Sequence, residues 1–138
     1  MKPTDTYRLA ITANDFKLCH ALLGDNPMPG DENRKLYSPT IMAVRDGRTI
    51  GVLSTANLTK LKAIVVNTLR VDKSIQNPTF VILHLIEAYE VILIKAGVRW
   101  YWAYVTKSNG KLVHLIQRVL GEPLQEDNGN LWFKREIA

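Results

Sequence analysis

Residues 69–97 read LRVDKSIQNPTFVILHLIEAYEVILIKAG, and this stretch decides the fold. It opens at the end of a run rich in β-branched residues, which predicts a strand within 62–71. Asn77 followed by Pro78 predicts the start of a helix, because asparagine caps well and proline fits the first helical position. From Phe80 to Ala96 polar residues cover only a narrow arc, so we expect a helix that is largely buried against a sheet.

The chain before this stretch predicts a strand, a helix and an irregular connection. Residues 7–12 alternate in polarity, which is typical of a strand. Asn14 and Asp15 can cap the helix that follows, and Gly24 is a plausible end for it. Residues 24–39 hold three prolines and several charges, so they are expected to form an irregular connection.

Two hairpins are predicted from their turn residues. Asp46-Gly47 separates two β-branched runs at 40–45 and 49–55, which is a strong two-residue turn signal. The C-terminal residues 122–137 are expected to form a second hairpin that turns within 127–130.

A further strand and helix lie between the Phe80–Ala96 helix and the second hairpin. Residues 98–106, VRWYWAYVT, are aromatic and β-branched, which predicts a strand. Ser108 or Asn109 then caps a helix that Gly121 ends. The apolar face of this helix consists of Leu112, Leu115, Ile116 and Val119.

The order of elements predicts an α+β fold with a mixed, mostly antiparallel twisted sheet flanked by helices. A chain of 138 residues fits one domain over 1–138. The net charge of +5 suits a phosphate-bearing cofactor, a nucleic acid or an acidic protein face. The polar start MKPTDTYR, the lack of a run long enough to cross a bilayer and the lone Cys19 together predict a cytoplasmic protein without a membrane span.

This order resembles the GNAT superfamily of acyl-CoA-dependent N-acetyltransferases, and the resemblance covers nearly the whole chain as a divergent member. The segment TIMAVRDGRTIGVLS is similar to the second and third strands of the family, and Asn109 matches its asparagine after the strand at 98–106. The resemblance implies acetyl-CoA as cofactor and an amine as acceptor. The chain also resembles, more loosely, the compact GNAT-like proteins of tailed phages.

The diagnostic motif of the family, Q/R-x-x-G-x-G/A, aligns with residues 76–81. Gln76 matches, but Thr79 and Val81 stand where the family has glycine or alanine, and Pro78 removes one amide donor from the phosphate cradle. The resemblance implies that backbone groups at the end of the preceding strand hold the cofactor arm, and that Lys111 meets the adenosine phosphate. The cofactor-binding candidates are therefore Leu69, Val71, Gln76, Asn77, Thr79, Phe80, Val81, Asn109 and Lys111.

Catalytic groups are scarce in the expected places. Residues 62–70 contain no Asp or Glu, and Asn67 is polar but cannot act as a base near neutral pH. The family's tyrosine acid would fall on Leu115 or Ile116, neither of which can donate a proton. Tyr104 and Asn67 are thus the remaining catalytic candidates, with Tyr101 as a further substitute for the acid. The three histidines lack metal-ligand spacing, so no metal site is expected.

Two functions stay open from the sequence. One is an active N-acetyltransferase, in which acidic residues of the 24–39 connection (Asp25, Asp31 and Glu32) hold a cationic amine or supply a base. The other is a catalytically inactive GNAT-fold interaction protein, for example a virion component or a phage protein that binds a host enzyme in the host cytoplasm. Nucleic-acid binding ranks last, because Trp100, Trp102 and Tyr104 are expected to be core residues.

Overall fold

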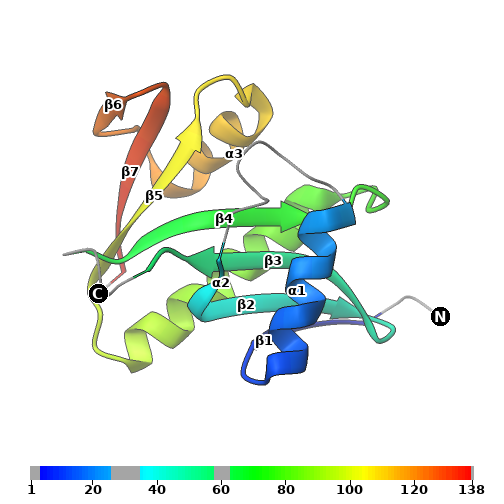
Figure 1. Cartoon of the computed structure of the whole chain (residues 1–138). Coiled ribbons are helices and arrows are strands. Elements are labelled where there is room, and N and C mark those ends of the chain that lie inside the picture. The colour runs from blue at the N-terminus through cyan, green and yellow to red at the C-terminus, as the bar shows by residue number, and fades with distance from the viewer. Residues whose placement is uncertain (1–3, 26–34, 58–62, 138) are drawn as a thin grey trace.

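The computed structural model describes residues 4–25, 35–57 and 63–137. The acidic residues Asp31 and Glu32 and the first residue of the predicted 62–71 strand therefore lie outside the described residues. Figure 1 shows the order of elements along the chain, which is β1 (Asp5–Leu9), α1 (Ala13–Asp25), β2 (Tyr37–Arg45), β3 (Arg48–Thr55), β4 (Val65–Val71), α2 (Pro78–Lys95), β5 (Trp100–Thr106), α3 (Gly110–Leu120), β6 (Gln125–Asp127) and β7 (Asn130–Glu136).

The strands form a seven-stranded mixed sheet in the order β1-β2-β3-β4-β5-β7-β6. Only β4 and β5 pair in parallel, and every other neighbouring pair is antiparallel. This arrangement confirms the predicted α+β fold with a mostly antiparallel sheet. Both predicted hairpins are present, and their turns at Asp46-Gly47 and Asn128-Gly129 have the paired positive φ angles of a two-residue hairpin turn.

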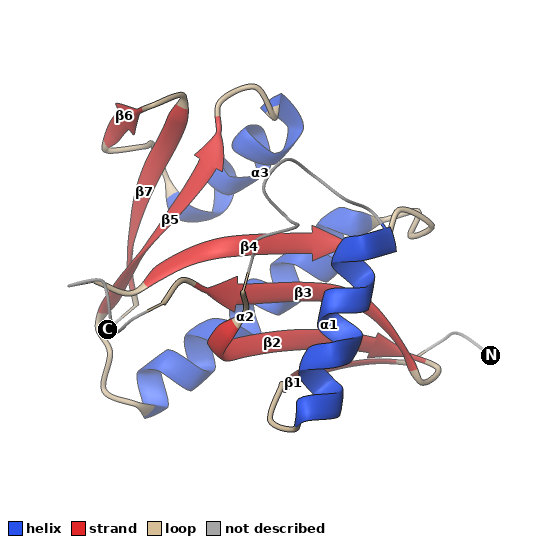
Figure 2. Ribbon diagram, viewed as in Figure 1, coloured by secondary structure: helices blue, strands red, loops and turns tan. Residues whose placement is uncertain are grey.

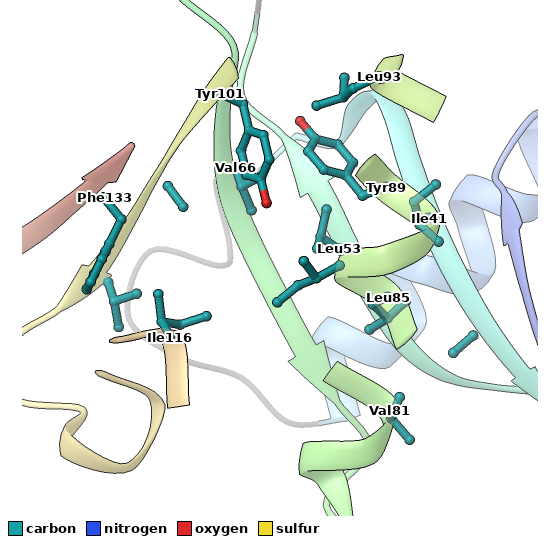
Figure 3. Packing of buried hydrophobic residues seen from close by; sticks show 14 of the residues in the cluster. Ile41, Leu53, Val66, Val81, Leu85, Tyr89, Leu93, Tyr101, Ile116 and Phe133 are labelled. Carbon is teal, nitrogen blue, oxygen red and sulfur yellow. The ribbon is translucent and has the colours of Figure 1, made fainter. Parts of the chain in front are cut away.

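Helices cover both faces of the sheet, as Figure 2 shows. On one face α1 buries Cys19 and Leu22 against Met42 and Val52. On the other face α2 and α3 pack over a larger core (Figure 3), in which Leu85 and Tyr89 of α2 meet Ile41 and Leu53 of the sheet. The two layers bury complementary faces of β2 and β3, because successive strand residues point to opposite sides.

The start of α1 differs from the sequence prediction. Thr12 is the N-cap, since its hydroxyl accepts the Asp15 N–H at 3.1 Å. The Asp15 carboxylate in turn accepts the N–H groups of Thr12 and Ile11, which is the reciprocal pattern of a capping box. These bonds hold residues 11–12 in the helix cap rather than in a strand, so β1 ends at Leu9 instead of continuing to Thr12.

Two expectations about burial were wrong. α2 starts at Pro78 as predicted, but it is buried on one side only, because it forms the outer layer of its face and its outer apolar side chains are exposed. In β5, Tyr101 is buried whereas Trp100 is 40% exposed. Trp102 and Tyr104 share the Trp100 face and are half-buried. The helix on that face, α1, packs on β2 and β3 and leaves β5 less covered (Figure 2).

Candidate functional site

β4 and β5 part from each other almost as soon as they pair. Their parallel register consists of Val65 opposite Trp102 and Val66 opposite Ala103, and the Trp102 N–H donates to the Ile64 carbonyl at 2.8 Å. Beyond these residues the two strands diverge, as Figure 1 shows. Beyond Val66, the edge of β4 that lies away from β3 therefore borders the opening and not β5.

A β-bulge lies where the strands part. On β3, Ser54 and Thr55 are consecutive, but their partners on β4 are Thr68 and Val66. Asn67 is thus an extra residue in β4, between the two residues that pair with Thr55 and Ser54 of β3. The strand bends there, which places the bulge at the closed end of the opening.

A cavity of about 500 Å³ fills the opening between the diverging strands. Its walls are mainly apolar, and they come from β4, β5 and α3, with single residues from β3 and α2. The lining consists of Leu53, Val66, Asn67, Thr68, Leu69, Arg70, Ile86, Tyr101, Ala103, Tyr104, Val105, Thr106, Ser108, Asn109, Leu112, Ile116 and Leu120.

The cavity brings together several of the residues predicted from the sequence. Asn67, Leu69, Tyr104 and Asn109 all line it. Asn109 is the N-cap of α3, as expected, and its Oδ1 accepts the Leu112 N–H at 3.4 Å. These residues come from three separate elements, so the fold gathers at one place what the sequence spreads over more than forty positions.

Two tyrosines, Tyr101 and Tyr104, line the cavity, and their hydroxyl groups lie in different environments. The Tyr101 hydroxyl donates to Glu90 Oε2 at 2.7 Å, and Arg135 Nε donates to the same oxygen at 3.0 Å. Burial, with the adjacent Glu90 carboxylate, raises the pKa of Tyr101 far above its ordinary value. Tyr101 therefore keeps its proton, and Tyr104, whose ring packs on Trp132 at 4.8 Å, is the better candidate acid.

The remaining predicted cofactor residues lie at the start of α2. Gln76, Asn77 and Phe80 line a second hollow together with Arg45 and Ser74. The Asn77 side chain accepts the Phe80 N–H at 3.4 Å. The amide of Phe80, a predicted cofactor-binding residue, therefore already has an acceptor. Pro78 has no N–H, and the Phe80 N–H is bound by Asn77. Of the first three residues of α2, Thr79 therefore has the amide best placed to donate to a ligand.

Four predicted residues line neither hollow. The Val81 side chain is fully buried in the core, and Val71 packs against that core. Thr79 and Lys111 are exposed on the surface. Of the two branched residues at the small positions of the motif, Val81 therefore points away from a ligand and only Thr79 faces solvent.

Sequence reasoning missed part of the lining. Leu112 was expected only as a packing residue of α3, and Leu120 and Arg70 were not singled out, yet all three border the cavity. Their position on the helix and strand faces nearest the opening is the signal that would have found them, once β4 and β5 were known to diverge.

The described residues also bear on metal binding and on membrane insertion. Among these residues, no group of three or more His, Cys, Asp or Glu side chains is placed to hold a metal ion. Within the same part of the chain, no helix has the length and apolar content that crossing a bilayer requires.

Solved structures with a similar fold are known, although the sequence itself matches no family model. No protein-family model matches the sequence, and no curated protein sequence matches it significantly. Among solved structures, the chain is similar to the ribosomal-protein-S18-alanine N-acetyltransferase of Escherichia coli, with a TM-score of 0.73 and 15% identity over 98% of this chain and 95% of that chain.

Two further structures show the same likeness. PaiA N-acetyltransferase of Thermoplasma acidophilum, solved in complex with coenzyme A, has a TM-score of 0.71 and 11% identity over 96% of this chain and 99% of that chain. Aminoglycoside 6'-N-acetyltransferase of Enterococcus faecium has a TM-score of 0.66 and 12% identity over 96% and 97% of the two chains. The chain therefore has the fold of the GNAT acetyltransferases, at a sequence identity that makes it a divergent example of that fold.

Proposed function

We propose that this protein binds an acyl-CoA thioester between β4 and β5 and transfers its acyl group to an amine. The observation that carries the proposal is the parting of the two strands directly after the Asn67 bulge, with a cavity of about 500 Å³ in the gap. The structural likeness to N-acetyltransferases, one of them solved with coenzyme A, supports it.

The cavity fits the extended arm of coenzyme A in shape and chemistry. Leu69 and Leu112 give it apolar walls, which suit an alkyl chain. The polar backbone of β4 beyond Val66, where the strand borders the cavity, suits the amides of the same arm. Backbone groups are present whatever the side chains, so this part of the site survives the divergence of the sequence.

The start of α2 is the place for the pyrophosphate. The N-terminus of an 18-residue helix favours a negative charge, and the exposed Thr79 offers both its amide and its hydroxyl there. The Asn77 cap competes with a phosphate for the Phe80 N–H, but its bond is long at 3.4 Å and can be exchanged for a charged acceptor.

Acetyl-CoA, when bound, supplies an activated acyl group and a thiolate leaving group. Negative charge develops on the carbonyl oxygen of the acyl group during transfer, so the reaction requires a hydrogen-bond donor from the cavity wall at that oxygen. Tyr104 is the group of the cavity that can return a proton to the leaving sulfur. The described lining contains no carboxylate or histidine, so the acceptor amine enters in its neutral form or meets a base outside this lining.

The lack of a base in the described lining favours a second candidate function. A GNAT-fold protein that retains the cavity but acts by binding another protein needs neither a base nor an acid. The phage-type roles suggested by the sequence belong to this candidate. The two candidates differ in turnover, since only the first consumes acetyl-CoA when an amine is present.

Calorimetric titration with acetyl-CoA and with CoA tests the cofactor site. We expect micromolar binding that is lost in Thr79→Glu, which puts a negative charge where the pyrophosphate would lie. Gln125→Glu on β6, an exposed position far along the sheet from α2, adds the same charge and should bind as the wild type does. Absence of binding to the wild-type protein would overturn the proposal. Release of free thiol in the presence of a mixed amine pool then separates the enzyme from the inactive binder.

A further inference from the structure

The outer side of α2 carries an apolar stripe that the described chain leaves exposed. Its members are spread over four turns of the helix, and Phe80, Leu83, Val91 and Ile94 are 50%, 39%, 45% and 49% exposed. The opposite side of α2 is equally apolar, because it forms the core. A helix that is apolar on both sides is typical of one that is covered on both sides in the assembled protein.

The stripe is symmetric about Glu87, which is exposed at its centre. Leu83 and Val91 lie four residues before and after Glu87, and Phe80 and Ile94 lie seven residues before and after it. Positions four and seven residues apart share one helix face. Helix geometry explains why these four positions share one exposed face. It does not explain why all four are apolar, on both sides of Glu87. The outer face of α2 therefore presents the same apolar pattern when it is read in either direction.

We propose that α2 pairs with α2 of a second copy of this chain, in antiparallel orientation and with the two-fold axis at Glu87. In this register Leu83 of one copy packs on Val91 of the other, and Phe80 packs on Ile94. A two-fold interface must be self-complementary in this way, since each contact occurs twice with the roles exchanged. A different protein partner would impose no such symmetry on the stripe.

The expected dimer is weak. Interfaces of standard size bury roughly 30–40 Å² per residue, so the four apolar stripe residues and Glu87 of both copies bury on the order of 300–400 Å² in total. This area is below the 1,200 Å² or so of stable complexes and matches concentration-dependent association. The two Glu87 carboxylates meet at the axis and weaken the pair further, while a polar residue within an apolar seam fixes its register.

Sedimentation equilibrium over a wide range of protein concentration tests the association. We expect the wild-type protein to dimerise at high concentration, Glu87→Gln to dimerise about tenfold more tightly through loss of the charge repulsion, and Leu83→Glu to stay monomeric. Ile11→Glu alters another exposed apolar side chain, 73% exposed and outside α2, and should dimerise as the wild type does. Circular dichroism of each variant confirms that the fold is kept. A wild-type protein that stays monomeric at the highest concentration overturns the proposal.

Disulfide cross-linking tests the register. The lone native thiol, Cys19, is fully buried, so an introduced cysteine is the accessible one. Glu87→Cys lies on the axis and should form dimers on mild oxidation. Leu83→Cys alone should not, because the two positions are about 12 Å apart along the helix pair. An equimolar mixture of Leu83→Cys and Val91→Cys should cross-link. Cross-linking of Leu83→Cys with itself as fast as Glu87→Cys contradicts the antiparallel register.

Discussion

Val81 and Gly51 are matched to each other across the α2–sheet interface. A Cβ atom on Gly51 would lie 3.0 Å from Val81 Cγ1 and 3.1 Å from Leu85 Cδ1, which is closer than most such atoms pack. The glycine in β3 thus makes room for the branched side chain in α2. Val81 takes the position of a small residue in the motif that the sequence resembles, and Gly51 absorbs its extra volume.

The first prediction is that Gly51→Ala destabilises the protein by about 1–3 kcal/mol, because the added methyl group overpacks the core. In a Val81→Ala background the same change should cost much less, since the methyl group then has room. Urea unfolding of the four proteins of this double-mutant cycle measures the coupling. Gly24→Ala, in helix α1 where a Cβ meets nothing within 4 Å, is the control; it should not destabilise and should raise stability by up to about 1 kcal/mol, because alanine favours a helix over glycine. Equal costs of Gly51→Ala in both backgrounds would contradict the pairing.

The second prediction concerns acid stability. Hydrogen bonds from Arg8 and from the N–H groups of Ile11 and Thr12 hold the pKa of the Asp15 carboxyl well below its ordinary value. The stability that this carboxylate contributes is therefore fully present above pH about 4, and it is lost as the pH falls toward the lowered pKa of the folded state. Asp15→Asn should lower Tm at pH 7 and make Tm less sensitive to pH between about 5 and 2.

Thermal unfolding followed at a series of pH values checks this second prediction. Asp46→Asn is the matched control, because it removes one carboxylate in a turn where the positive φ of 50° suits asparagine equally well. Its Tm should follow the wild-type pH profile. Parallel loss of Tm on acidification in the wild type and in Asp15→Asn would show that the cap is not the acid-sensitive element.

The third prediction separates the two tyrosines of the cavity. Tyr104→Phe should lower kcat for acetyl transfer about 10- to 100-fold while leaving the Kd for CoA unchanged, because the hydroxyl acts on the leaving sulfur and not on binding. Tyr101→Phe should lower stability rather than kcat, since its hydroxyl is committed to Glu90. Steady-state kinetics and calorimetry on both variants measure the difference. Unchanged kcat in Tyr104→Phe would remove it from the reaction.

The fourth prediction tests the cavity itself. Leu112→Trp places a larger ring in a wall of the cavity and should abolish CoA binding by filling the space of the cofactor arm. Leu124→Trp enlarges an apolar side chain that is 64% exposed and outside the lining, so it should bind CoA normally. If both variants bind CoA with wild-type affinity, the ligand occupies another part of the surface.

The features predicted correctly from the sequence are those that neighbouring residues decide. The turns at Asp46-Gly47 and Asn128-Gly129 follow from residues that tolerate positive φ, and the start of α2 follows from Asn77 and Pro78. The order of these elements was then sufficient to indicate the fold. The Asn109 cap of α3 belongs to the same group, because capping involves residues only three positions apart.

The features that the sequence did not predict depend on contacts between distant residues. The bulge at Asn67 is visible only in the register of β4 against β3, and no residue type marks it. The outward side of α2 looks like a buried one, because Leu83 and Val91 are as apolar as the residues of the core. The aromatic residues of β5 are only partly covered because α1 packs on β2 and β3. The sequence of β5 carries no information about the position of α1.

The short pairing of β4 with β5 has a consequence for how the molecule opens. Since two residue pairs join the strands, the unit formed by β5, α3, β6 and β7 can open separately from the rest of the fold, which makes it a candidate for sub-global unfolding. Tyr101 and Arg135, through Glu90 of α2, hold this unit at one end. A ligand that spans β4 and α3 would link the two units, so amide hydrogen exchange should slow across the whole sheet when it binds.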